Sequence, residues 1–122
     1  MKSAPWTTRT LIESYDFGSI VIDRRKFRRD VVIFPDRIEE NWWRKEGHAL
    51  RIEDVSEIVK AKPEILVIGT GYSGMMKIHP QTEQYLRSSG IELIAFETER
   101  ACKTFNELSK SRRVVAALHL TC

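Results

Sequence analysis

The sequence predicts an α/β fold of three layers: a central mixed, mostly parallel sheet, helices, and an additional N-terminal antiparallel β layer. Three observations lead to this prediction. Short β-branched and aromatic segments crowd the first third of the chain, a continuous apolar run follows, and amphipathic segments then alternate with further apolar runs. At 122 residues the chain has room for one core, so residues 1–122 are predicted to form a single domain.

The antiparallel layer is expected from the spacing of the first strand-like segments. Residues 11–17 and 20–22 are separated by Gly18 and Ser19, and residues 31–34 follow after a basic stretch. Such close spacing leaves no room for crossover helices, so neighbouring segments are expected to pair antiparallel.

The alternating part begins with residues 53–60, where apolar positions recur at helical spacing. The run Ile65-Leu66-Val67-Ile68 has the continuous apolar character of a strand that is buried on both faces. Further helices are expected from Pro80 to about Gly90 and from Thr98 onward, with Thr98 as the N-cap. Further strands are expected over residues 91–96 and 113–120.

The glycine-rich segment after the buried strand matches the dinucleotide-binding pattern G-x-G-x-x-G through Gly69, Gly71 and Gly74. Glu97 even lies where such folds place the acid that binds ribose. A helix that began inside this motif would, however, meet Pro80 after about two turns, where proline breaks the helical hydrogen-bond ladder. The chain also lacks room for a second mononucleotide-binding half. We therefore expect no dinucleotide and no other cofactor.

A small anionic ligand is a separate possibility for the same turn. Successive N–H groups in glycine-rich turns form anion-binding concavities, and strand ends line crevices in open α/β sheets. Gly69, Thr70, Gly71, Lys77 and Thr98 are the residues predicted to line such a pocket. The alternative is a tight turn that requires glycine only for its backbone conformation.

Other candidate chemistry is weak. His119 and Cys122 have a spacing that a metal could use, but zinc needs three or four ligands and no further cluster accompanies them. Cys102 lies on the apolar stripe of a predicted helix, which indicates a buried and inert thiol rather than a partner for His48. No catalytic set and no metal site is predicted, and both cysteines are expected to be reduced.

Charge and hydropathy limit the partners of the protein. Twenty Lys and Arg residues face 17 Asp and Glu residues, giving a net charge of +3. The basic residues at positions 24–29 lack aromatic stacking partners, so we expect a solvated turn between strands rather than a nucleic-acid site. Residues 1–6 lack the apolar stretch of a signal peptide, and no apolar run is long enough to insert in a membrane. These features indicate a cytoplasmic location.

Several short segments together resemble a known family, that of the domain of unknown function 498. They are Phe17-Gly18 with Ile20, Asp30-Val31-Val32-Ile33, the tryptophan before Gly47-His48, Val67-Ile68-Gly69-Thr70-Gly71, Thr98 with Ala101, Asn106, and His119-Leu120-Thr121-Cys122. The resemblance runs from about residue 12 to residue 122. Its members include archaeal and bacterial hypothetical proteins, adipogenesis-associated proteins of animals, and mitochondrial complex I assembly factor 3.

The resemblance implies a three-layer α/β fold, no established enzymatic activity, and, in the mitochondrial branch, action through protein partners. Two hypotheses follow. The first is a non-enzymatic protein-interaction or assembly-helper module with a partner of unknown identity. The second is a binder of, or an enzyme acting on, a small anionic ligand at the turn of residues 69–74.

Overall fold

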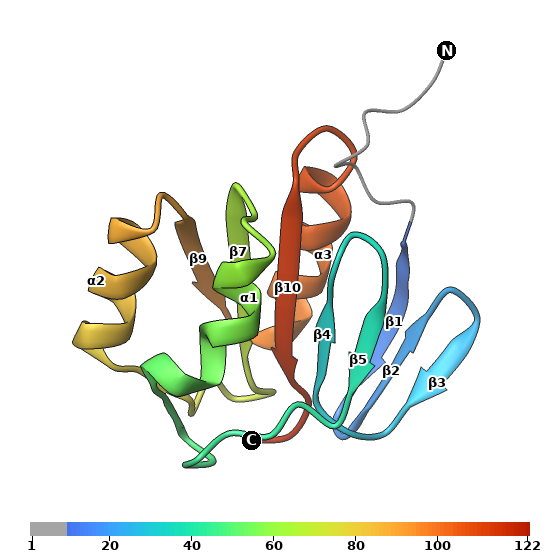
Figure 1. The fold of residues 1–122 in the computed structure, drawn as a ribbon. Helices are drawn as coiled ribbons and strands as arrows, with labels where there is room; N and C mark the ends of the chain where they lie inside the picture. The colour runs from blue at the N-terminus through green and yellow to red at the C-terminus, as the bar shows by residue number, and fades with distance from the viewer. Residues whose placement is uncertain (1–9) are drawn as a thin grey trace.

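The computed structural model describes residues 10–122 and contains a five-stranded mixed sheet in the order β5-β4-β10-β7-β9 (Figure 1). The strands β7 (Ile65–Thr70), β9 (Glu92–Phe96) and β10 (Val114–His119) are parallel. In β7 and β10 almost every residue is buried, which explains why both segments read as continuous apolar runs.

The remaining strands of this sheet are short and antiparallel. Strand β4 (Val31–Ile33) pairs with β10, and β5 (Ile38–Glu40) pairs with β4. Because β4 runs opposite to β10, the residue before β4 and the last residue of β10 lie at the same edge of the sheet. This is the carboxyl edge of the three parallel strands.

An additional layer packs on one face of the sheet. It consists of the antiparallel strands β1 (Ile12–Asp16), β2 (Ser19–Ile22) and β3 (Arg25–Phe27). Helix α3 (Thr98–Leu108) lies beside them and covers the same face (Figure 1). Apolar side chains of this layer, among them Ile20 and Phe105, form one core with the alternate sheet residues that face them.

The opposite face carries the helices α1 (Ser56–Lys60), which continues the 3₁₀ turn η1 (Ile52–Val55), and α2 (Pro80–Ser88). The strands β6 (Ala49–Leu50) and β8 (Lys77–Ile78) form a separate two-stranded parallel ladder, and Leu50 and Ile78 pack in the core of this face. The sheet is thus covered on both faces, and the three-layer α/β fold predicted from the sequence is confirmed.

The structure corrects two local predictions. Only part of the basic stretch is a turn: Arg24 lies in the turn after β2, whereas Arg25–Phe27 pairs with β2 and buries Phe27 while its charged residues stay in water. Charged residues suit the outer strand of a small sheet, so hydropathy alone did not reveal it. Glu97 rather than Thr98 takes the N-cap position of α3, and Thr98 is fully buried as the first helical residue.

Helix α2 begins at Pro80, as predicted, so the glycine motif opens no helix. Among the described residues, no helix is long and apolar enough to cross a membrane. Residues 1–6, on which the signal-peptide argument rests, lie outside the described residues, and the extent of the domain over residues 1–122 stays a prediction.

Candidate functional site at the carboxyl edge

The glycine turn ends β7 in a place where the chain is tightly packed. A Cβ atom on Gly69 would lie 2.8 Å from Thr98 Oγ1 and 2.9 Å from a methyl carbon of Leu118. Gly71 has a φ of +109°, and a Cβ atom there would lie 2.5 Å from the main-chain oxygen of Cys122. Both positions need glycine for close approach, and Gly71 also needs it for its φ.

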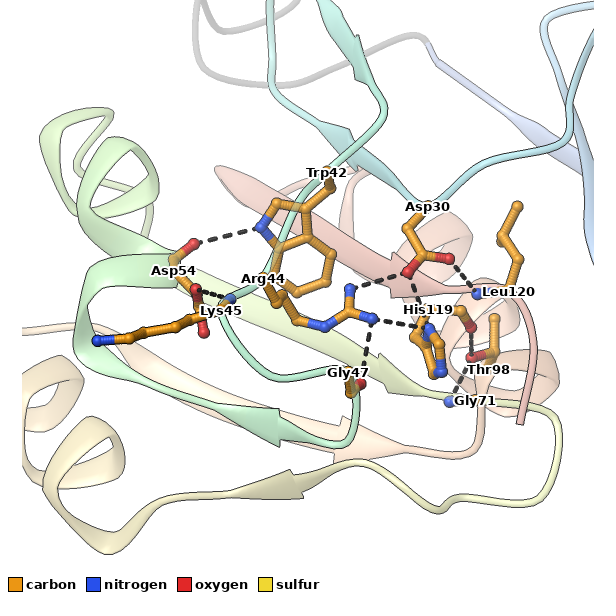
Figure 2. Close-up of polar contacts among 10 residues, drawn as sticks. All are labelled: Asp30, Trp42, Arg44, Lys45, Gly47, Asp54, Gly71, Thr98, His119 and Leu120. Atoms are coloured by element: carbon orange, nitrogen blue, oxygen red, sulfur yellow. Dashed lines mark hydrogen bonds and ion pairs between the residues drawn. The ribbon is translucent and has the colours of Figure 1, made fainter.

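Thr98 connects the turn with two neighbouring elements. Its hydroxyl accepts a hydrogen bond from the Gly71 N–H at 2.9 Å and donates to the His119 carbonyl at 2.6 Å (Figure 2). The Thr70 hydroxyl donates to the Phe96 carbonyl at 3.0 Å. The hydroxyls of Thr98 and Thr70 therefore join the ends of β7, β9 and β10.

Other N–H groups of the turn also have acceptors within the chain. The Tyr72 N–H donates to the Thr121 carbonyl at 2.7 Å, and the Met75 N–H donates to the Cys122 carbonyl at 3.2 Å. The residues after β10 thus fill the space beside the turn. An anion that used the N–H groups of Gly71, Tyr72 and Met75 would have to replace these acceptors.

The five residues predicted to line an anion pocket are only partly together. Gly69, Thr70, Gly71 and Thr98 meet at the strand ends. Lys77 lies in β8 and is exposed. Within residues 10–122, no hydrogen bond or ion pair joins the Lys77 side chain to the other four.

A buried ionic cluster lies next to this turn (Figure 2). Asp30 Oδ2 is 2.8 Å from His119 Nδ1 and 2.9 Å from Arg44 Nη1, and Asp30 Oδ1 accepts the Leu120 N–H at 2.8 Å. Arg44 Nη2 donates to the Gly47 carbonyl at 3.2 Å. The Arg44–Asp30 approach is an ion pair without the directed geometry of a hydrogen bond.

Three distant segments supply this cluster. Asp30 precedes β4, Arg44 follows β5, and His119 ends β10. Their side chains are 17%, 5% and 7% exposed, respectively. A charge so poorly solvated must be paired, because an isolated buried charge is very costly.

Geometry favours one protonation pattern for His119. Its Nδ1 lies 2.8 Å from Asp30 Oδ2 and 3.0 Å from Arg44 Nη2. Ionised Asp30 only accepts and arginine only donates, so Nδ1 can satisfy one of them. With a proton on Nδ1, His119 donates a hydrogen bond to Asp30, and Arg44 Nη2 donates to the Gly47 carbonyl instead of to His119.

The environment shifts the titration of Asp30. Burial alone would raise the pKa of Asp30, but the hydrogen bonds from His119 and the Leu120 N–H, together with the charges of His119 and Arg44, outweigh it. The pKa of Asp30 is therefore lowered from its ordinary value of 3.8. Asp30 stays ionised wherever the protein is folded at neutral pH.

An Asp–His pair is a common acid–base arrangement. His119 Nε2 and Arg44 Nε are buried without a hydrogen-bond partner among the described residues. Over residues 10–122, no group of three or more His, Cys, Asp and Glu side chains could hold a metal ion. What the contacts do is fix the ends of β4 and β10 and the loop after β5 relative to one another.

His48 and Cys122 lie beside the cluster and are exposed. The His48 and His119 rings meet edge to face with centroids 6.1 Å apart, and Cys122 Sγ is 3.5 Å from His48 Nε2. Cys102 is buried in the α3 core, as predicted from its place on the apolar stripe of the helix, and the thiol next to His48 is Cys122.

A group of side chains, here called the aromatic patch, flanks the same edge. It consists of the exposed residues Phe17, Tyr72 and Met75 and of Tyr15, which is partly buried against the core. The Phe17 and Tyr72 rings meet edge to face at 5.7 Å, although these residues are 56% and 54% exposed. Met75 is 50% exposed.

Main-chain carbonyl groups after β10 form hydrogen bonds with residues of this patch and with the residue that follows Phe17. The Leu120 carbonyl accepts the Gly18 N–H at 2.9 Å beside Phe17, and the Thr121 carbonyl accepts the Tyr72 N–H. The Tyr15 hydroxyl donates to the same Leu120 carbonyl at 2.8 Å. The patch therefore stands on main chain that is anchored in the central sheet.

Sequence reasoning missed the ionic cluster and the aromatic patch. A usable signal existed for the cluster: Asp30 directly precedes one apolar run and His119 directly ends another. Antiparallel pairing of those two runs places both residues at one edge. No local signal predicted Arg44, which comes from an irregular loop.

A family model described as "Protein of unknown function (DUF498/DUF598)" matches residues 12–119. The chain belongs to this family. The resemblance noted from its short motifs is thereby confirmed.

Curated relatives of this chain from vertebrates carry a functional name. The chain is 29% identical over 108 residues to NADH dehydrogenase [ubiquinone] 1 alpha subcomplex assembly factor 3 of Xenopus tropicalis, and 30% identical over 111 residues to that of Danio rerio. These matches cover 87% and 88% of the chain. The chain spans only 58% and 62% of the length of these curated relatives.

A solved structure agrees with the fold. A conserved hypothetical protein of Pyrococcus horikoshii OT3 is 30% identical and superposes with a TM-score of 0.79. The superposition covers 91% of this chain and 98% of that one.

Proposed function

We propose that this chain is a non-enzymatic protein-interaction module that helps other proteins to assemble. The observation that carries the proposal is the aromatic patch, in which Phe17, Tyr72 and Met75 are each at least half exposed and stand on a rigid edge. Exposed aromatic and methionine side chains are enriched at protein-binding surfaces. Relatives of this family that are named as assembly factors support the same function.

The packing around the patch favours binding over catalysis. The turn hydroxyls and N–H groups bond within the chain, and the ionic cluster is buried beneath the surface. Such an arrangement holds a surface in a fixed shape. A preformed surface loses little conformational entropy on binding, which favours affinity.

Affinity capture with patch variants tests the proposal. The doubly substituted chain Phe17→Ser/Tyr72→Ser should stay folded with only a small change in melting temperature, because both side chains are more than half exposed. It should lose a stoichiometric partner that the wild type recovers from native lysate, with affinity reduced roughly tenfold or more, as for interface hot spots. Trp43→Ser is the matched control, because Trp43 is 74% exposed but lies in the loop after β5.

Two results would contradict the proposal. One is that the wild type recovers no stoichiometric partner. The other is that the patch variant and Trp43→Ser recover the same partner equally well. Equal recovery would mean that binding does not use the patch.

The alternative of a small anionic ligand at Gly69, Thr70, Gly71, Lys77 and Thr98 stays a prediction from the sequence. Saturating binding must stabilise the fold, so thermal-shift measurements with phosphates, nucleotides and carboxylates test it. The cytoplasmic location and the absence of nucleic-acid binding also stay predictions.

A further inference from the structure

Strand β9 forms one outer edge of the five-stranded sheet, where it pairs only with β7 among the described residues (Figure 1). The Glu92 N–H donates to the Glu64 carbonyl at 3.0 Å, on the β7 side. Peptide groups alternate in direction along a strand, so Ile94 and Phe96 also face β7. The N–H and C=O groups of Leu93 and Ala95 therefore point away from the sheet.

The two outer edges of the sheet differ in how they are protected. Strand β5 is three residues long, and two of these are the exposed glutamates Glu39 and Glu40. Charges and short length are common means of preventing edge-to-edge pairing. Strand β9 is five residues long, reads Glu-Leu-Ile-Ala-Phe, and has only one charge, at its start. Its edge is open to a further strand.

Space for the side chains of a further strand exists on both faces of β9. On the α3 side, an apolar groove of about 560 Å³ is lined by Ile94, Phe96 and the α3 residues Arg100, Lys103 and Leu108, among others. On the α2 side, a groove of about 460 Å³ runs along Leu93 and Ala95. Ala95 itself is exposed, so α2 does not cover the edge there.

We propose that the open edge of β9 pairs antiparallel with β9 of a second copy of this chain, around a two-fold axis at Ile94. Full overlap of Glu92–Phe96 then places Leu93 opposite Ala95 of the second copy, and Ala95 opposite its Leu93. Two outward residues in each copy, each bonded through N–H and C=O to its opposite residue, give four main-chain hydrogen bonds. The two sheets become one continuous sheet.

Charge complementarity favours a second copy as the occupant. In this register Glu92 lies opposite Phe96 of the second copy, on the same face of the joined sheet. The Arg100 guanidinium stacks on the Phe96 ring of its own chain, 3.8 Å from the centroid. Glu92 of each copy thus lies beside Arg100 of the other.

Both charges are available for this contact. Within residues 10–122, neither Glu92 nor Arg100 takes part in an ion pair of its own chain. The two-fold axis produces the pair twice, and it brings the two half-buried Ile94 side chains together at the centre. The β9 edge can therefore pair with a second copy of itself through main-chain hydrogen bonds, opposite charges and an apolar contact. This self-complementarity is what an isologous interface requires.

Sedimentation velocity and light scattering on the full chain, from micromolar to millimolar concentration, test the proposal. We expect a dimer whose dissociation constant rises about tenfold or more in Glu92→Arg and in Arg100→Glu, since each variant sets like charges against each other twice. The double variant Glu92→Arg/Arg100→Glu should restore the dimer. An equimolar mixture of the two single variants should also associate.

A backbone variant tests the strand pairing itself. Ala95→Pro removes an outward N–H but leaves the β7 side of β9 intact, so it should abolish the dimer with little change in melting temperature. Glu40→Arg, a charge reversal at the opposite edge, is the matched control and should leave the dimer unchanged. These variants leave the aromatic patch intact, so this test is independent of the proposed function.

Two outcomes would overturn the proposal. The first is a wild-type chain that is monomeric throughout the concentration range. The second is a dimer that all the β9 variants, folded as judged by circular dichroism, leave unchanged. That dimer would use another surface.

Discussion

The two cysteines of this chain have opposite surroundings. Cys102 is 5% exposed within the core under α3, and burial, with a smaller contribution from the charge of Glu99, raises its thiol pKa to about 12. Cys122 is exposed beside the His48 imidazole. Since the thiolate is the reactive form, both its burial and its raised pKa should make Cys102 unreactive in the native protein.

This contrast predicts that a disulfide reagent such as 5,5′-dithiobis(2-nitrobenzoate) titrates one thiol of the native protein near pH 8. The reactive thiol should be Cys122, so Cys122→Ser should abolish the fast phase and Cys102→Ser should preserve it. Denaturant should expose the second thiol. If Cys102 in the native protein reacted as fast as Cys122, the burial of the Cys102 thiol under α3 would be contradicted.

The glycine turn after β7 shows how an element can depend on residues that follow much later in the chain. Gly71 lies against the main chain of Thr121 and Cys122, while its N–H bonds to Thr98. The turn conformation and the path of the chain after β10 therefore require each other. Together they hold Tyr72 and Met75 of the aromatic patch in place.

Substitution of Gly71 by alanine should expose this dependence. Strain at φ +109° and the close approach to Cys122 should lower the free energy of unfolding by about 3 kcal/mol. Gly90→Ala is the matched control, because Gly90 has φ of +78° but nothing within 4 Å of its Cβ position, so it should cost about 1 kcal/mol. Urea denaturation of both variants measures the difference. If the two variants lost the same free energy of unfolding, the main chain near Cys122 would be able to move away from a Cβ atom at position 71 without strain.

For the whole molecule, the main feature is a sheet buried on both faces and tied at its carboxyl edge by the ionic cluster. Asp30, Arg44 and His119 connect the residue before β4, the loop after β5 and the end of β10. Their low exposure makes each charge dependent on the others. Removing one should cost more than removing an exposed ion pair.

The lowered pKa of Asp30 predicts a specific acid sensitivity. The pKa of Asp30 is lower in the folded protein than in the unfolded chain, where it is near 3.8. Ionised Asp30 therefore stabilises the fold at pH values above the unfolded pKa. This contribution is lost as the pH falls through the folded pKa. Asp30→Asn should therefore lower the free energy of unfolding by about 3 kcal/mol at pH 7, because Arg44 is left buried without a counter-charge.

Urea unfolding as a function of pH checks this prediction. The gap between wild type and Asp30→Asn should be constant above about pH 5 and should narrow below pH 4. Asp36→Asn is the matched control, since the side chain of Asp36 is 77% exposed. A gap that stays constant into acid would show that the ionised form of Asp30 is not the stabilising species.

Much of the fold could be predicted because its elements carry local signals. The buried strands β7 and β10 are continuous apolar runs, α2 begins at a proline, and α3 has one apolar face. Strand β3 escaped prediction because only Phe27 is buried. A three-residue outer strand leaves too weak an alternation to distinguish it from a turn.

The candidate site was predictable only in part. Glycine, threonine and strand ends placed Gly69, Gly71 and Thr98 at one edge, because parallel strands bring their carboxyl ends together. Asp30 and His119 are 89 positions apart in sequence, and Arg44 and His119 are 75 apart. No periodicity relates residues so distant, so their pairing was not visible.

The sequence by itself determined the class of fold, the family, and the sharp turn after β7, because these depend on local hydropathy, glycine and short motifs. Only the tertiary structure decided what that turn contacts. The residues after β10 pack beside Gly71, and their carbonyl groups accept hydrogen bonds from N–H groups of the turn. The tertiary structure also decided which edge of the sheet stays open, because the order of the strands arises from long-range pairing.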